Sequence, residues 1–96
     1  MDAGIRIKPV VAPNPMVGAS VLRFSTHRPG PLRVAIFDVS GRRVRSLVDD
    51  TQSPAGLHIL TLDNRGDSGA KLDSGIYFYR IRSTEGLEQG RFLIMN

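Results

Sequence analysis

Residues 62–82 read LDNRGDSGAKLDSGIYFYRIR, and this stretch decides the fold of the chain. Its first half is rich in residues that favour turns, and its second half alternates apolar and aromatic residues. Alternation with a period of two is typical of a β-strand that buries one face. We therefore predict a polar loop followed by a long strand that turns Tyr77 and Tyr79 toward the interior, opposite Ile76 and Phe78.

The chain on both sides of this stretch has the same character. Short alternating segments are separated by clusters of Gly, Pro, Asp and Ser, and no window shows the sustained 3.6-residue period of a helix. The candidate strands are residues 5–11, 20–26, 32–39, 42–48, 57–62, 75–83 and 89–95. This number of short strands in about a hundred residues predicts an all-β fold, an antiparallel immunoglobulin-like β-sandwich.

The start of the chain is expected to lie at the rim of this fold. Pro9 interrupts the first candidate strand, and residues 12–15 (Ala-Pro-Asn-Pro) form a breaker cluster that should end it. We expect a single domain over residues 1–96, in which residues 1–13 are an edge strand and lead-in and residues 14–96 are the main module.

A second turn is predicted at residues 38–42, which read Asp-Val-Ser-Gly-Arg. Asp38 opens it, and Gly41 suits the positive φ that a three-residue hairpin loop requires. We expect a tight hairpin here, followed by a return strand whose arginines point to solvent. Residues 49–56 are polar and are expected to form a loop.

The composition excludes several classes of protein. The chain has no cysteine, so it has neither disulfides nor a thiolate metal site. No apolar run approaches the ~20 residues of a membrane span, and the first residues lack the features of a signal peptide. If the domain is exported, we expect the signal to lie outside this chain.

The acidic loop invites two specific interpretations. Arg65-Gly66-Asp67 is the tripeptide that integrins recognise, and Asp63, Asp67 and Asp73 carry oxygen atoms that calcium prefers. However, Arg65 places a cation at the third ligand position of the calcium-loop pattern. Gly and Asp are also the ordinary residues of turns, so we interpret these residues as structural.

The remaining polar residues do not predict catalysis. His27 and His58 are the only imidazoles, and no serine, cysteine or carboxylate motif surrounds them. Arg42, Arg43 and Arg45 divide between the two faces of a strand without an aromatic platform, which favours an edge-protecting surface over nucleic-acid binding. We expect no enzyme activity, no cofactor and no nucleic-acid partner.

The order of the motifs resembles a group of related bacterial modules. The motifs are Asn14-Pro15, VAIFDVSGRRV at 34–44, SPAGLH at 53–58, LDNRGDSG at 62–69 and LDSGIYFYRI at 72–81. Over residues 14–96 the chain resembles the immunoglobulin-like domain of flagellar hook-capping proteins and the type A C-terminal sorting domain of type IX secretion. Members often have Trp-Asp-Gly where this chain has Leu62, Asp63 and Asn64.

The resemblance implies a non-catalytic module of a larger exported protein, located outside the cell or at its surface. Its expected partners are the secretion machinery or cell-surface proteins. The alternative is a structural assembly module, as in hook-capping proteins or a surface filament, that associates with itself through edge strands such as residues 5–11. The residues interpreted as a fold signature are Asp63, Asn64, Asp67, Gly69, Gly75, Tyr77 and Tyr79, with Asp38 and Gly41 for the hairpin.

Overall fold

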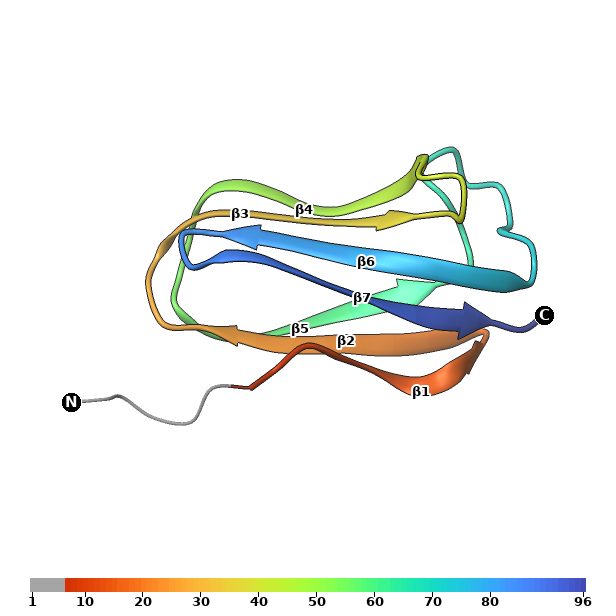
Figure 1. The fold of residues 1–96 in the computed structure, drawn as a ribbon, viewed down its shortest axis with the longest axis horizontal. Coiled ribbons are helices and arrows are strands. Elements are labelled where there is room, and N and C mark those ends of the chain that lie inside the picture. Colours follow the sequence, from red (N-terminus) through yellow and green to blue (C-terminus); the bar gives the residue numbers. More distant parts are fainter. Residues whose placement is uncertain (1–6) are drawn as a thin grey trace.

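The computed structural model describes residues 7–96 as seven β-strands in two facing sheets (Figure 1). The strands are β1 (Val10–Val17), β2 (Ala19–Thr26), β3 (Gly30–Phe37), β4 (Arg43–Ser53), β5 (Gly56–Asp63), β6 (Gly75–Ser83) and β7 (Gly86–Ile94). Sheet A contains β1, β2 and β5, and sheet B contains β4, β3, β6 and β7 in that order, with antiparallel neighbours in each. This arrangement confirms the predicted all-β, immunoglobulin-like β-sandwich. Residues 7–96 contain no helix that is long and apolar enough to cross a membrane.

β1 belongs to both sheets. Residues 10–12 pair with β2 in sheet A, whereas Met16 pairs in parallel with Ile94 of β7 in sheet B. Pro13 and Pro15 lie between the two pairings, and each follows a cis peptide bond. A proline has no backbone N–H to give to a ladder, so both lie where the strand leaves one sheet for the other.

The expectation that residues 12–15 end the first strand is therefore wrong, because the interruption is a change of partner within one strand. The candidate strand over residues 5–11 begins outside the described residues. Within them, the carbonyl of Ile7 accepts the N–H of Ser25 at 3.0 Å. This bond holds the segment before β1 along β2.

β4 is longer than predicted. Residues 49–53, expected as part of a polar loop, extend the strand and pair with the start of β3, as in the pair Asp49 and Arg33. The segment is polar because β4 is the edge of sheet B, where charged side chains face water and discourage pairing with another sheet. Only residues 54–55 then connect β4 to β5 in the other sheet.

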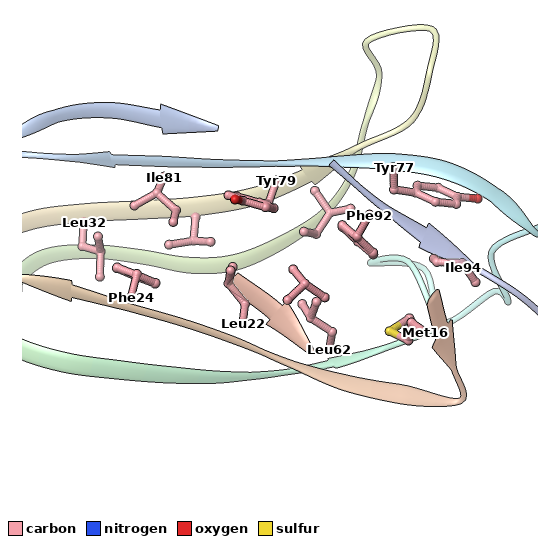
Figure 2. Packing of buried hydrophobic residues seen from close by; sticks show 13 residues of the cluster. Met16, Leu22, Phe24, Leu32, Leu62, Tyr77, Tyr79, Ile81, Phe92 and Ile94 are labelled. Carbon is pink, nitrogen blue, oxygen red and sulfur yellow. The ribbon is translucent and has the colours of Figure 1, made fainter. Parts of the chain in front are cut away.

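The core fills the space between the sheets, and Figure 2 shows side chains from both sheets pointing into it. Tyr77 and Tyr79 are 7% and 8% exposed, while Ile76 and Phe78 on the opposite face of β6 are 41% and 38% exposed. The predicted orientation of this strand is confirmed. The buried apolar residues are Val11, Met16, Leu22, Phe24, Leu32, Val34, Ile36, Leu62, Tyr77, Tyr79, Ile81, Phe92 and Ile94.

One contact explains how a tyrosine ring fits inside the sandwich. Tyr79 lies opposite Gly90 in the pairing of β6 with β7. A Cβ atom on Gly90 would collide with the ring and hydroxyl of Tyr79. Because Gly90 has no side chain, the ring of Tyr79 can occupy the space beside it.

Candidate functional site

The loop between β5 and β6 is tied to β4 by Arg45. Its Nη1 atom donates to Oδ1 of Asp63 at 2.7 Å and to the backbone carbonyl of Arg65 at 2.8 Å. The same Asp63 oxygen accepts the N–H of Arg65 at 3.0 Å, which closes a local turn. The expectation that the arginines of this strand point to solvent is wrong for Arg45, because its guanidinium reaches from sheet B to the end of β5.

The Arg-Gly-Asp tripeptide contacts the backbone of β4. The N–H of Asp67 donates to the carbonyl of Val44 at 2.9 Å, and the Asp67 carboxylate accepts the N–H of Ser46 at 3.0 and 3.2 Å. A Cβ atom on Gly66 would lie 2.9 Å from the Val44 carbonyl oxygen, so this close approach requires glycine. The loop thereby covers polar backbone groups at the edge of sheet B.

The rest of the loop closes on itself and on the end of the chain. Gly69 has a φ of +88°, donates its N–H to the carbonyl of Gly66 at 2.9 Å and accepts Nη1 of Arg65 at 2.8 Å through its own carbonyl. The Nδ2 atom of Asn64 donates to Oδ1 of Asn96 at 3.3 Å. These polar groups therefore shape the loop.

Tyr77 fixes the end of the loop to the core, just after β6 begins at Gly75. Its hydroxyl donates to the carbonyl of Asp73 at 2.7 Å. Burial raises the pKa of Tyr77, and the negative charges of Asp73 and Asp38 raise it further. Burial also raises the pKa of Tyr79. Both phenols therefore stay protonated at neutral pH.

The hairpin between β3 and β4 is organised by Asp38. Its Oδ1 atom accepts the N–H of Ser40 at 2.9 Å, the hydroxyl of Ser40 at 2.6 Å and the N–H of Arg42 at 3.1 Å. The bond from the Ser40 hydroxyl is the main reason why the pKa of Asp38 is lowered. Gly41 has a φ of +87° and donates its N–H to the Asp38 carbonyl at 3.0 Å, so the hairpin has the tight turn that the sequence predicts.

The hairpin and the loop lie at the same end of the sandwich, on the right of Figure 1. An open groove of about 730 Å³ separates them, and Ser40, Arg42 and Ser68 are among its lining residues. Two of the carboxylates on this groove accept backbone N–H groups. Asp38 accepts those of Ser40 and Arg42 in its own turn, and Asp67 accepts that of Ser46 in β4. These acids therefore hold the shape of the groove.

The possible metal ligands do not form a metal site in the described part of the chain, and the two histidines have structural contacts. Among residues 7–96, no group of three or more His, Asp or Glu side chains is placed to hold a metal ion. Nε2 of His58 lies 3.0 Å from the hydroxyl of Thr26, and its ring stacks on Phe24 with 5.0 Å between centroids. The exposed His27 donates its backbone N–H to Glu85 at 2.6 Å. These contacts place both histidines in packing and turn structure.

Sequence analysis does not predict the exposed surface of sheet B. Phe37 and Phe78 are neighbours there, and Arg80 lies over the Phe37 ring. The alternation of Phe78 with Arg80 is visible in the sequence, but the position of Phe37 beside them depends on which strands pair. The pattern of Arg42, Arg43 and Arg45 within one strand therefore does not reveal that Phe37 lies beside Arg43 on this face.

The fold is that of an immunoglobulin-like β-sandwich domain without a disulfide. The sequence matches the family described as the secretion system C-terminal sorting domain over residues 10–95. The chain belongs to this family, whose members are sorting domains of type IX secretion. Among curated proteins none matches the sequence.

Two examples represent the solved structures that are similar to this chain. One contains PorZ, an essential bacterial surface component of the type-IX secretion system of Porphyromonas gingivalis, with 20% identity and a TM-score of 0.62 over 92% of this chain. This likeness shows the fold alone. The other is dimeric latent PorU from Porphyromonas gingivalis, with 25% identity and a TM-score of 0.69 over 91% of this chain. The chain spans 11% and 9% of the lengths of those two chains.

Membership of the sorting-domain family implies export to the cell surface or the extracellular space, and an association with secretion machinery. The match confirms the part of the predicted resemblance that concerns the sorting domain of type IX secretion. The likeness to flagellar hook-capping domains stays a prediction.

Proposed function

We propose that this chain is a non-catalytic sorting module that the type IX secretion machinery reads as a folded surface, and that it directs a larger protein to the cell surface. The observation that carries the proposal is the family match over residues 10–95. All seven strands lie within that range, from Val10 of β1 to Ile94 of β7. A signal of this extent is a folded domain rather than a short linear peptide.

A non-catalytic role agrees with the contacts of the polar residues. Asp63 and Asp67 accept hydrogen bonds from β4 and from their own loop, and Tyr77 donates to the loop backbone. Polar side chains that form hydrogen bonds of this kind within the protein fix the shape of its surface. A fixed shape is what a receptor for a folded signal requires.

The test is export of a reporter. A fusion of a signal peptide, a reporter enzyme and this domain is expressed in a host that has type IX secretion, and reporter activity is measured in the periplasm, on the cell surface and in the medium. We expect the reporter outside the cell. Retention in the periplasm, while the host exports its own substrates, would contradict the proposal.

The matched control is the same fusion with Leu22→Asp. Leu22 is fully buried, and an unpaired carboxylate in the core should unfold the domain. Export of the wild-type fusion together with loss of export for Leu22→Asp supports recognition of the folded surface. Equal export of both fusions would show that a linear segment is read instead.

A structural assembly module is the second candidate, and one observation favours it. β5 is the edge of sheet A, and Leu57 and Ile59 on it are 52% and 59% exposed. An edge strand with exposed apolar side chains can pair with another chain. Light scattering at high concentration should then detect a dimer that Ile59→Lys abolishes, and a strictly monomeric wild type would reject this candidate.

A further inference from the structure

The outer face of sheet B has an apolar strip at one end. The strand register places Phe37 of β3 beside Phe78 of β6, and Ile76 of β6 beside Leu93 of β7. Ile76, Phe78 and Leu93 are each about two-fifths exposed, at 41%, 38% and 40%. Exposed apolar side chains that are contiguous in this way mark a site of interaction.

Arginines border the strip on both sides. Arg43 of β4 pairs with Phe37, and Arg91 of β7 pairs with Phe78, so one row across the sheet reads Arg-Phe-Phe-Arg. The guanidinium of Arg80, one row away, lies over the Phe37 ring at 4.6 Å from its centroid. Aromatic residues and arginine are the residue types that contribute most to protein interfaces.

This face also concentrates the positive charge of the molecule. Its arginines are Arg33, Arg43, Arg80, Arg82 and Arg91, and the acid paired with them across the strands is Asp49, bound to Arg33 at 3.2 Å. Five positive charges less one negative charge give +4, which equals the formal net charge of the whole chain. The face therefore presents a positive field to any partner that approaches it.

Two shallow hollows lie on this face on either side of the Arg80 and Phe37 contact. The larger, of about 510 Å³, has Phe78 and Arg91 among its lining residues. The smaller, of about 230 Å³, has Arg43 and Arg82 among its lining residues. Each hollow thus places guanidinium groups next to an aromatic ring.

We propose that the outer face of sheet B binds an acidic segment of a partner protein, which pairs its carboxylates with Arg43, Arg80 and Arg91 and places an apolar side chain against Phe78. This inference rests on the proposed function, because the natural partner would be a component of the secretion machinery. Charge complementarity favours such a partner, since carboxylates are among the groups that arginine binds with two parallel hydrogen bonds. The apolar strip supplies the central contact that such an interface needs.

A second copy of this chain does not fit the same face. Two such faces would bring together two surfaces that each carry a net +4, and like charges across an interface oppose association. Single-stranded nucleic acid is also disfavoured. Its bases stack on free ring faces, whereas Arg80 covers Phe37, and Ile76 and Leu93 are aliphatic.

The first experiment is a titration of the isotope-labelled chain, followed by backbone amide chemical shifts. The probes are a peptide with one phenylalanine flanked by glutamates, the same peptide with alanine for phenylalanine, a lysine version of the first peptide, and oligothymidylate. We expect shift changes at residues 33–37, 43–46, 76–82 and 89–93 with the first peptide, and weaker binding of the other probes. No shift changes with it, changes confined to other residues, or tighter binding of oligothymidylate would each overturn the inference.

Paired charge reversals provide the control. Arg80→Glu with Arg91→Glu changes the proposed surface, and Arg23→Glu with Arg28→Glu makes the same change of net charge on β2 and the turn after it. The first pair should weaken binding of the acidic peptide by more than about tenfold, because carboxylates would then face carboxylates. The second pair should have a much smaller effect. Equal losses would show that only net charge matters and would overturn the inference.

The export assay separates this inference from the proposed function. If the wild-type fusion is exported and the Arg80→Glu, Arg91→Glu fusion is not, both are supported. If the two fusions are exported equally, the binding face is wrong and the sorting function stands. If the wild-type fusion stays in the periplasm, the sorting function fails, and the peptide titration alone decides whether the face binds acidic protein segments.

Discussion

The loop between β5 and β6 and the outer face of sheet B use arginine in opposite ways. In the loop region, Arg45 and Arg65 donate to the chain's own carboxylate and carbonyl oxygens. On the face, Arg43 and Arg91 form no ion pair within residues 7–96. The loop, which is the most conspicuous motif in the sequence, thus forms hydrogen bonds within the fold. The arginines of the outer face of sheet B stay available to a partner.

The largest expected effect separates the two faces of β6. Tyr79→Ala should lower the free energy of unfolding by about 3–5 kcal/mol, because it removes a buried ring and leaves a cavity beside Gly90. Phe78→Ala should cost less than about 1 kcal/mol, since it removes only a cross-strand contact on the exposed face. Urea denaturation of both variants measures the difference. Equal costs would show that the outer face is part of the core.

The next effect tests whether the loop is docked on β4. Gly66→Ala places a Cβ atom 2.9 Å from the Val44 carbonyl oxygen and should cost about 1–3 kcal/mol. Arg91→Ala on the outer face should change stability by less than about 0.5 kcal/mol. Thermal and urea unfolding of the two variants checks this. A neutral Gly66→Ala would mean that the loop is free of the strand edge.

How far the sequence predicts this fold depends on the segment. The alternation in residues 20–26 and 75–83 predicts β2 and β6 closely, because each strand has one buried face. The prolines in residues 12–15 predict the end of a strand, but they mark the point where β1 changes from one sheet to the other. The polar residues 49–53 predict a loop, but they belong to the exposed edge strand β4. A pattern within one strand does not reveal which edge of the sheet that strand occupies.

The site was harder to predict for the same reason. The turn residues Asp38 and Gly41 act locally, so their positions in the sequence suffice to predict the hairpin. The contact of Asp67 with Ser46 requires that the loop lie against β4. The row of Arg43 and Phe37 with Phe78 likewise requires the order β4-β3-β6, which no local pattern contains.

A smaller effect should follow from the link between Arg45 and Asp63. Arg45→Lys removes the guanidinium that reaches both Asp63 and the carbonyl of Arg65. Because the two side chains are 30% and 48% exposed, the loss should be only about 0.5–1 kcal/mol. A double-mutant cycle with Asp63→Asn measures the coupling, and a coupling of zero would show that Arg45 does not hold the loop.

The pH dependence of stability tests whether the inward face of β6 is buried. Burial raises the folded-state pKa of Tyr79 above its ordinary value of 10.0, so its contribution to stability is complete below pH 10.0 and is lost as the pH rises through the folded pKa. Tyr79→Phe should therefore reduce the loss of stability in alkali. The chain has two tyrosines, so ultraviolet titration of this variant also reports Tyr77 alone. A wild-type titration at the pKa of free tyrosine would contradict the buried placement.

Export of a loop variant and of a face variant, each shown to be folded by its unfolding curve, tests whether the outer face of sheet B rather than the loop is recognised. The loop variant is Ser68→Ala with Lys71→Ala, which changes exposed side chains between the docked residues. The face variant is Phe78→Ala with Arg91→Ala, which changes the centre and border of the apolar strip. We expect the loop variant to be exported like the wild-type fusion and the face variant to be retained in the periplasm. Normal export of the face variant would contradict this expectation, and so would retention of the folded loop variant.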